Sequence, residues 1–309
     1  MALESFTANG TDDDGVPEVY QENRRWYGTS KRGAYMFPID EEELERLDIF
    51  HKMFLHSRKG ALFSAPLSNT ETPRILDVGC GTGIWGMDVA EKFPRGNLVG
   101  VDLYRIQPEF IFENTRYQIM DVEATWKDLD PGTFDLIHMR TLNGSIANWP
   151  LIYAETYRHL KPYYGYIEHV ELDFTPRSED PSIVRDTPLE KWANDMFEVM
   201  DRFGRPLRVD SNLTKQRLAD AGFVDIKEEV IAIPINAWMR EPYQREIGRW
   251  YDLAMEKGYH SLSVGPFSRG FNRPLAEIAE FNDKVKTQAH KRDTRVTCNL
   301  HVFTARKPQ

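Results

Sequence analysis

Three alternating glycines with an acidic residue on either side are the residues of this chain whose types and spacing could do chemistry. Gly79, Gly81 and Gly83 follow directly after a short apolar run. Glycine tolerates a positive φ angle and lacks a Cβ, so a ligand can lie against the backbone of such a loop. Asp77 precedes the first glycine by two positions, and Asp102 follows it by 23. A nucleotide fold places a carboxylate for ribose hydroxyls at about that distance. The pattern predicts a site for a nucleotide-type small molecule.

The order of these residues separates two kinds of nucleotide loop. A dinucleotide site prefers G-x-G-x-x-G/A, but here the third glycine comes one residue early and Ile84 stands where glycine or alanine is wanted. The pattern D-x-G-x-G-x-G instead resembles the nucleotide loop of class I S-adenosylmethionine-dependent methyltransferases. That ligand has no phosphate, so helix N-terminal amides matter less than they do for a pyrophosphate. Asp77 can supply or organise a carboxylate for the ammonium group of its amino-acid tail. A tight turn without a ligand is the alternative interpretation.

The loop needs a strand before it and a helix after it. Ile75–Val78 reads as a strand buried on both faces, and Ile84–Phe93 can form a helix that Pro94 stops. Further strands are expected at Leu98–Val101, Arg116–Met120, Thr133–Met139, Gly165–Leu172, Val224–Ile233 and Arg295–Arg306. We therefore expect an α/β fold with a seven-stranded Rossmann-like sheet of the class I methyltransferase type, including its late antiparallel strand.

Helical patterns surround these strands and suggest how the chain is organised. Residues 1–19 are expected to form a mobile acidic tail, and residues 20–309 a methyltransferase domain. Within that domain, residues 20–60 form an N-terminal flap and a helix over Asp40–Lys59. Helices over Ser182–Phe203, Ala237–Gly258 and Pro274–His290 fall in two insertions, 175–212 and 237–290, that form a cap. The aromatic and basic stretch Tyr20–Pro38 is either a flap that covers the cofactor and helps form the acceptor pocket, or a strap packed on the core, and both can hold at once.

Open α/β sheets bind ligands outside the carboxyl ends of their strands, so the residues at those ends are site candidates. Asp121 matches the acidic residue that contacts the adenine amino group in class I methyltransferases. The predicted cofactor-binding set combines these ends with the glycine loop and the flap: Tyr27, Tyr35, Asp77, Gly79, Gly81, Gly83, Asp102, Leu103, Asp121, Val122, His138, Met139 and Arg140.

The strand Gly165–Leu172 carries polar residues where a buried strand should be apolar. Buried acids are costly unless paired, so either one face meets water and the cap, or Glu168, His169 and Glu171 line a pocket. We take His138, His169 and Glu168 as catalytic candidates. A general base is needed only if the acceptor holds a proton at neutral pH. The alternative for each histidine is a hydrogen-bonded structural residue.

Composition narrows the class of partner. The 309-residue chain has 39 basic and 48 acidic residues, a net charge of −9, which disfavours direct binding of nucleic acid. The two cysteines, Cys80 and Cys298, suggest neither a metal site nor a disulfide framework. No apolar run approaches membrane-spanning length, and the N-terminus has no signal-peptide core. A soluble intracellular protein is expected.

The span from about Arg24 to the C-terminus resembles the LaeA-like family of fungal methyltransferases. The resemblance rests on segments in matching order: RRWYGTSKRGAYMFPIDEEELERLDIFH, ILDVGCGTGIW, VGVDLYRIQPE, FDLIHMR, YIEHVELDFTPR, IGRWYDLAMEKG and HVFTARKP. It implies S-adenosylmethionine as cofactor, S-adenosylhomocysteine as product, no metal, and a role in secondary metabolism or development.

The resemblance leaves the methyl acceptor open between a protein and a small metabolite. It also implies a velvet-type regulatory protein as partner, and a location in the nucleus, the cytoplasm or both. There are two alternative functions. A regulatory module can keep the cofactor pocket and act by docking a partner with little or no turnover. A nicotinamide dehydrogenase is disfavoured by Ile84.

Overall fold

The computed structural model describes residues 19–309 and is built around one seven-stranded sheet. The strand order is β5-β4-β3-β6-β7-β9-β8, and β9 runs opposite to the other six strands, antiparallel to both β7 and β8. This arrangement confirms the α/β fold and the late antiparallel strand expected from the sequence. The strands are β3 (Arg74–Val78), β4 (Asn97–Asp102), β5 (Thr115–Ile119), β6 (Leu136–Arg140), β7 (Tyr166–Arg177), β8 (Val224–Pro234) and β9 (Thr297–Arg306).

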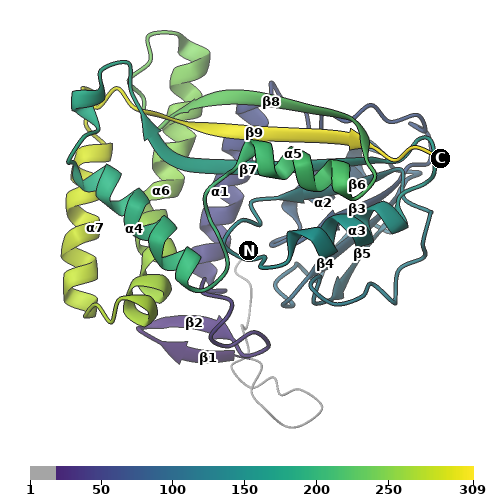
Figure 1. Cartoon of the computed structure of the whole chain (residues 1–309), viewed down its shortest axis with the longest axis horizontal. Helices are drawn as coiled ribbons and strands as arrows, with labels where there is room; N and C mark the ends of the chain where they lie inside the picture. The colour runs from purple at the N-terminus through teal and green to yellow at the C-terminus, as the bar shows by residue number, and fades with distance from the viewer. Residues whose placement is uncertain (1–18) are drawn as a thin grey trace.

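Seven α-helices are found in the described residues. They are α1 (Glu41–Ser57), α2 (Ile84–Lys92), α3 (Trp149–His159), α4 (Pro188–Arg202), α5 (Ser211–Asp220), α6 (Pro242–Gly270) and α7 (Leu275–Ala289). Helices α1, α4, α6 and α7 gather at the end of the sheet where the parallel strands finish, on the left of Figure 1. None of the helices in residues 19–309 has the length and apolar character needed to span a membrane.

Helix α6 differs most from its predicted bounds. The sequence suggested Ala237–Gly258, but the helix begins at Pro242 and continues to Gly270. The side chain of Glu241 accepts hydrogen bonds from the backbone amides of Tyr243 and Gln244, and proline is well tolerated in the first helical turn. The helix runs past Gly258 because tertiary packing outweighs the weak helix propensity of one glycine.

A short hairpin precedes α1, which the sequence analysis did not predict. It consists of β1 (Val19–Glu22) and β2 (Arg25–Gly28), paired antiparallel. The turn residues Asn23 and Arg24 have φ angles of 54° and 63°. Two positive φ angles are typical of hairpin turns that usually carry Asn-Gly. Because the second position is arginine here, the turn signal was absent from the sequence.

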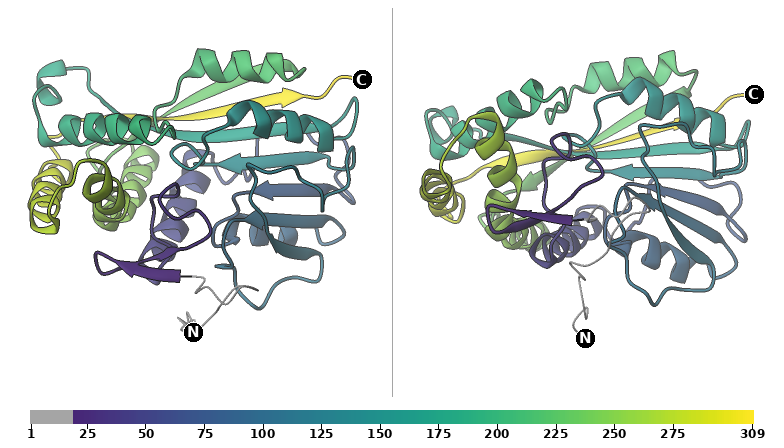
Figure 2. Two further views of the ribbon diagram at one scale, coloured as in Figure 1. Left: turned by 60° about the horizontal axis from the view of Figure 1, so that its bottom comes forward. Right: turned by 90° about the horizontal axis from the view of Figure 1, so that it is seen from below.

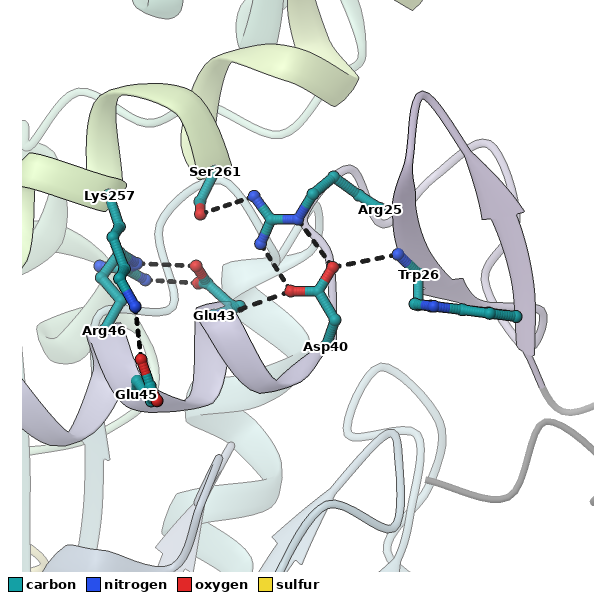
Figure 3. Close-up of polar contacts among 8 residues, drawn as sticks. All are labelled: Arg25, Trp26, Asp40, Glu43, Glu45, Arg46, Lys257 and Ser261. Atoms are coloured by element: carbon teal, nitrogen blue, oxygen red, sulfur yellow. Dashed lines mark hydrogen bonds and ion pairs between the residues drawn. The ribbon is translucent and has the colours of Figure 1, made fainter. Parts of the chain in front are cut away.

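Polar contacts fix the hairpin to α1 and α6. Figure 3 shows Arg25 between Asp40, at the start of α1, and Ser261 of α6. Arg25 Nε and Nη2 donate to the two oxygens of Asp40 at 2.7 and 2.6 Å, and Nη1 donates to Ser261 Oγ at 2.9 Å. Asp40 also accepts from the Glu43 amide, as expected for the N-cap of α1. The segment between the hairpin and α1 is therefore anchored at both ends, by Arg25 before it and by Asp40 after it.

Candidate active site

One cavity lies at the carboxyl ends of β3, β4 and β6. It measures about 190 Å³, more than ten times the roughly 15 Å³ that one water needs. Its wall includes the glycine loop, the segment between the hairpin and α1, the inner face of α1, three residues of β7 and one residue of α6. Figure 2 shows the hairpin and the segment after it beside the helical group, at the strand ends. The cavity has the position that open α/β sheets give to their ligands.

The glycine loop takes the left-handed backbone that its composition predicts. Gly79, Gly81 and Gly83 have φ angles of 66°, 55° and 77°. Gly79 and Gly81 line the cavity, whereas Gly83 does not. A Cβ on Gly83 would stand 2.4 Å from the Tyr117 hydroxyl oxygen, and that hydroxyl donates to the Gly83 carbonyl at 2.9 Å. Gly83 is therefore required by packing behind the loop.

Asp102 closes β4 and holds the loop from the other side. Its Oδ2 accepts from the Gly81 amide at 2.8 Å, and its Oδ1 accepts from the Tyr104 amide at 3.3 Å. Among residues 19–309, no cationic side chain forms an ion pair with it. Burial raises the pKa of Asp102 to about 6, although the Gly81 and Tyr104 amides favour the charged form. Asp102 is therefore a half-buried carboxylate that lines the cavity, and its oxygens can accept further hydrogen bonds.

Asp77 and His138 form a buried pair beneath the loop. They are direct neighbours in the register of β3 and β6, and His138 Nδ1 lies 3.0 Å from Asp77 Oδ1. Burial raises the pKa of Asp77 to about 7 and lowers the pKa of His138 well below its ordinary value. Trp85 of α2 stacks on the imidazole, with ring centroids 3.7 Å apart. In the described part of the chain, His138 Nε2 has no hydrogen-bond partner.

The other two catalytic candidates lie outside the cavity lining. Glu168 is fully buried and accepts from Arg58 Nη2 at 2.7 Å and from the amides of Ser64 and Ala65 at 2.5 and 2.8 Å. His169 lies on the opposite face of β7, where its ring nitrogens meet the Tyr153 hydroxyl and Glu171, each at 2.9 Å. Both side chains are engaged in structural contacts.

Glu171 is the acidic residue of β7 that reaches the cavity. Its Oε1 accepts from the amides of Leu142 and Asn143 at 2.8 and 3.1 Å, in addition to His169. Those amides belong to the turn after β6, where Thr141 has a φ angle of 53°. A non-glycine residue in this region is uncommon and is often found at functional sites. The polar face of β7 thus supports the cavity edge through one residue.

The structure brings together most of the predicted cofactor residues. Those in the cavity lining are Tyr35, Asp77, Gly79, Gly81, Asp102, Leu103, Asp121, Val122, His138 and Arg140. Gly83, Tyr27 and Met139 are not in it. Tyr27 packs beside α6, stacked on Tyr20 and covered by Arg269, because β2 turns that face away from the sheet. Met139 is fully buried in the core, since alternate residues of β6 face opposite sides of the sheet.

A group of apolar side chains also lines the cavity, and the sequence indicated it only in part, through the flap Tyr20–Pro38 as a candidate wall of the acceptor pocket. These side chains come from the segment after the hairpin, from α1, from β7, from the loop after α4, and from α6: Phe37, Phe50, Phe54, Leu172, Phe174, Leu207 and Leu262. The stripe on α1 was visible in the sequence, but a stripe shows only that a face is covered. We refer to these seven residues as the apolar chamber.

The chain matches a family model described as a methyltransferase domain over residues 20–228. It is 41% identical to the secondary metabolism regulator LAE1 of Cochliobolus heterostrophus, over 98% of this chain and 100% of that protein. It is 38% identical to the protein-methionine methyltransferase laeA of Emericella nidulans, over 94% and 77% of the two chains. A solved Haemonchus contortus phosphoethanolamine N-methyltransferase 2 aligns with a TM-score of 0.48 and 17% identity, over 85% and 57% of the chains.

The fold, the glycine loop and the matched domain define a methyltransferase. Within this class, the chain belongs to the LaeA-like family, whose members named above include a secondary metabolism regulator and a protein-methionine methyltransferase. The family resemblance noted in the sequence is therefore confirmed, as is the methyltransferase class of the enzyme.

Proposed function

We propose that this methyltransferase takes its methyl group from S-adenosylmethionine and releases S-adenosylhomocysteine. Asp102 is the observation that carries the proposal. It is a half-buried carboxylate at the end of β4 that lines the cavity, without an ion-pair partner among residues 19–309. Hydroxyl donors of a ribose would stabilise its charged form, which burial alone disfavours. The residues present therefore fit this cofactor.

Other lining residues would contact the remaining parts of the donor. Asp121 would accept from the adenine amino group, and Asp77 would face the ammonium group of the amino-acid tail. Gly79 and Gly81 would let the donor approach the backbone, since neither carries a side chain. When bound, the donor supplies a methyl group already activated on a sulfonium, so the protein mainly aligns the two reactants.

The apolar chamber supports an uncharged, apolar acceptor group. Its phenylalanine and leucine side chains would exclude water from an acceptor atom placed next to the donor half. A methionine thioether suits this lining because sulfur packs well against aromatic rings and has no proton to lose. One relative is named a protein-methionine methyltransferase. We propose a thioether or similar group of a protein as the acceptor, with a small apolar metabolite as the alternative.

His138 would serve as a base only for an acceptor that carries a proton. Asp77 can hold the Nδ1 proton at 3.0 Å, which leaves a lone pair on Nε2. This is how a carboxylate fixes the tautomer of a basic imidazole. A thioether acceptor needs no base, and for it the imidazole would only hold Asp77 in position.

Regulation of secondary metabolism or development is the proposed role, with a velvet-type regulatory protein as partner and action in the nucleus, the cytoplasm or both. The relatives named as regulators support the first part. The competing function is a cofactor-binding module that docks such a partner with little turnover. Gly79→Glu and Gly81→Glu separate the two in a fungal strain: an enzyme loses its phenotype, whereas a docking module keeps it.

The biochemical test uses the purified full chain. We expect micromolar binding of S-adenosylmethionine by calorimetry, none of NAD, and loss of binding in Asp102→Ala. Incubation with methyl-tritiated donor and a fungal extract should then place label in acid-precipitated protein. Label recovered only in an organic extract would favour the metabolite acceptor, and absence of donor binding would refute the proposal.

A further inference from the structure

Arg140 stands at the carboxyl end of β6 and presents a positive charge that the protein does not neutralise directly. It lines the cavity, yet no carboxylate oxygen within residues 19–309 comes within 4.0 Å of its guanidinium. Burial lowers the pKa of Arg140 to about 10, so the group remains protonated at neutral pH. Even a partly buried cation is costly without a carboxylate partner, which makes this arginine an unusual feature of the site.

The acidic groups near Arg140 are each engaged elsewhere. Asp77, Asp88 and Glu168 all favour its charged form by their proximity. Asp77 pairs with His138, however, and Asp88 pairs with His51. Glu168 accepts from Arg58 and two backbone amides, which occupies both of its oxygens. These carboxylates therefore lower the cost of placing a cation here but leave its donors for a ligand.

Two helices hold the guanidinium in position. Arg140 Nη1 lies 3.3 Å from His51 Nδ1, and His51 Nε2 lies 2.9 Å from Asp88 Oδ2. Because Asp88 takes the proton on Nε2, Nδ1 is left as an acceptor for the arginine. Burial, with the neighbouring Arg140, lowers the pKa of His51 to about 4, which keeps the imidazole neutral. The ring of Phe54 supports the guanidinium from another side at 4.5 Å.

We propose that Arg140 binds the α-carboxylate of the methyl donor's amino-acid tail, and that His51 and Asp88 are its positioning residues. This inference rests on the proposed cofactor. An arginine fork suits a carboxylate because it can donate two parallel hydrogen bonds. Asp77 lines the same cavity with the opposite charge, and a zwitterionic tail carries an ammonium and a carboxylate together. An anionic acceptor would use only one of the two.

The test compares two donors that differ only in the carboxylate. The probes are S-adenosylmethionine and decarboxylated S-adenosylmethionine, and the quantity measured is the ratio of their dissociation constants by calorimetry. Wild-type protein should bind the intact donor more tightly by about 10- to 100-fold, the usual range for a hydrogen bond to a charged group. Arg140→Gln should remove most of that preference while it leaves the affinity for the decarboxylated donor nearly unchanged.

Retained binding of the decarboxylated donor shows that the variant is folded. His51→Phe, which removes the acceptor for Arg140, should reduce the preference partly, and Arg140→Lys should restore only part of it. Arg205→Gln is the matched control, since Arg205 also lines the cavity but pairs with Glu123 at 2.8 Å. It should leave the ratio unchanged.

The outcomes separate this inference from the proposed cofactor. Equal affinity of the wild-type protein for both donors, or an unchanged ratio in Arg140→Gln, would overturn the role of Arg140 and leave the cofactor standing. If the wild-type protein binds neither donor, both the cofactor and the carboxylate site are refuted.

Discussion

Glu168 is the catalytic candidate that the structure most clearly connects to folding, and it can be tested directly. Its two oxygens accept three hydrogen bonds, from Arg58 and from the amides of Ser64 and Ala65. Glu168→Ala would leave the arginine cation without its carboxylate and both amides without an acceptor. Removal of one partner from a buried ion pair costs about 3–5 kcal/mol. We expect a loss of this size, out of a total of about 5–15 kcal/mol for a typical domain.

Glu168→Gln is a more specific test, because it removes the charge and nearly conserves the volume of the side chain. In either orientation of the amide, its NH₂ group faces a donor, either Arg58 or the two backbone amides. We therefore expect a loss of about 1.5–3 kcal/mol in the free energy of unfolding. Urea titration followed by far-ultraviolet circular dichroism measures it. Glu179→Gln, the same change at an exposed residue, should stay within about 0.5 kcal/mol of wild type.

A double-mutant cycle tests the pair itself. The double variant Glu168→Leu with Arg58→Met should lose less free energy of unfolding than the sum of the two single variants. Each single variant leaves one buried charge unpaired, whereas the double variant leaves none. The reasoning is refuted if Glu168→Gln unfolds at the wild-type urea concentration yet loses methyl transfer. That result would make Glu168 a catalytic residue reached by motions of the chain.

The glycine loop, Asp102 and His290 give three further predictions. At Gly83 a Cβ would meet Tyr117 Oη at 2.4 Å, so Gly83→Ala should lower the free energy of unfolding by about 1–3 kcal/mol. At Gly81 it would meet only Leu47 at 3.6 Å, so Gly81→Ala adds the strain of a positive φ angle but no clash. It should cost less stability than Gly83→Ala and weaken donor binding in calorimetry; equal loss of stability in both contradicts this. Burial raises the pKa of Asp102 to about 6, above the unfolded value of about 3.9, so its contribution to stability rises as pH falls between about 7 and 4. Hydrogen bonds from ribose hydroxyls would lower the pKa of Asp102, so binding of the methyl donor near pH 6 should release up to about half a proton. Calorimetry in buffers of different ionisation enthalpy measures this release. Proton uptake would contradict the prediction. His290 joins α7 to α6 through Asp252 at 2.5 Å and Glu256 at 2.8 Å, and the hydrogen bond to Asp252 raises its pKa. This stabilisation is complete below the unfolded pKa of about 6.5 and is lost as pH rises through the folded pKa. His290→Gln should therefore flatten the dependence of melting temperature on pH. An unchanged slope would count against the contact.

The donor half of the site could be predicted because its signals are local. An apolar run, three glycines and an acid at a fixed spacing all fall within Arg74–Asp102. The end of each parallel strand then places Asp121, His138 and Arg140 at one edge of the sheet. These positions depend on the fold class alone, which the order of strands and helices already indicated.

The partners of these residues could not be predicted, because they depend on tertiary contacts. Arg58 and Glu168 are 110 positions apart in the chain, and His51 and Arg140 are 89 apart. A polar residue on a buried strand indicates that a partner or a pocket exists, but not which. The sequence therefore left the alternatives for Glu168 and His169 open, and the structure places both among structural contacts.

The two parts of the cavity come from different parts of the chain. The donor half is encoded by one continuous stretch and the strand ends, whereas the apolar chamber takes Phe37, Phe54 and Leu262 from three separate segments. Arg25 joins two of those segments to the third through Asp40 and Ser261, so their relative positions are set together. Substitutions in these segments can reshape the chamber without a contact to the glycine loop. Relatives with the same donor loop can therefore differ in acceptor, which is why the glycine loop identifies the donor much better than the acceptor.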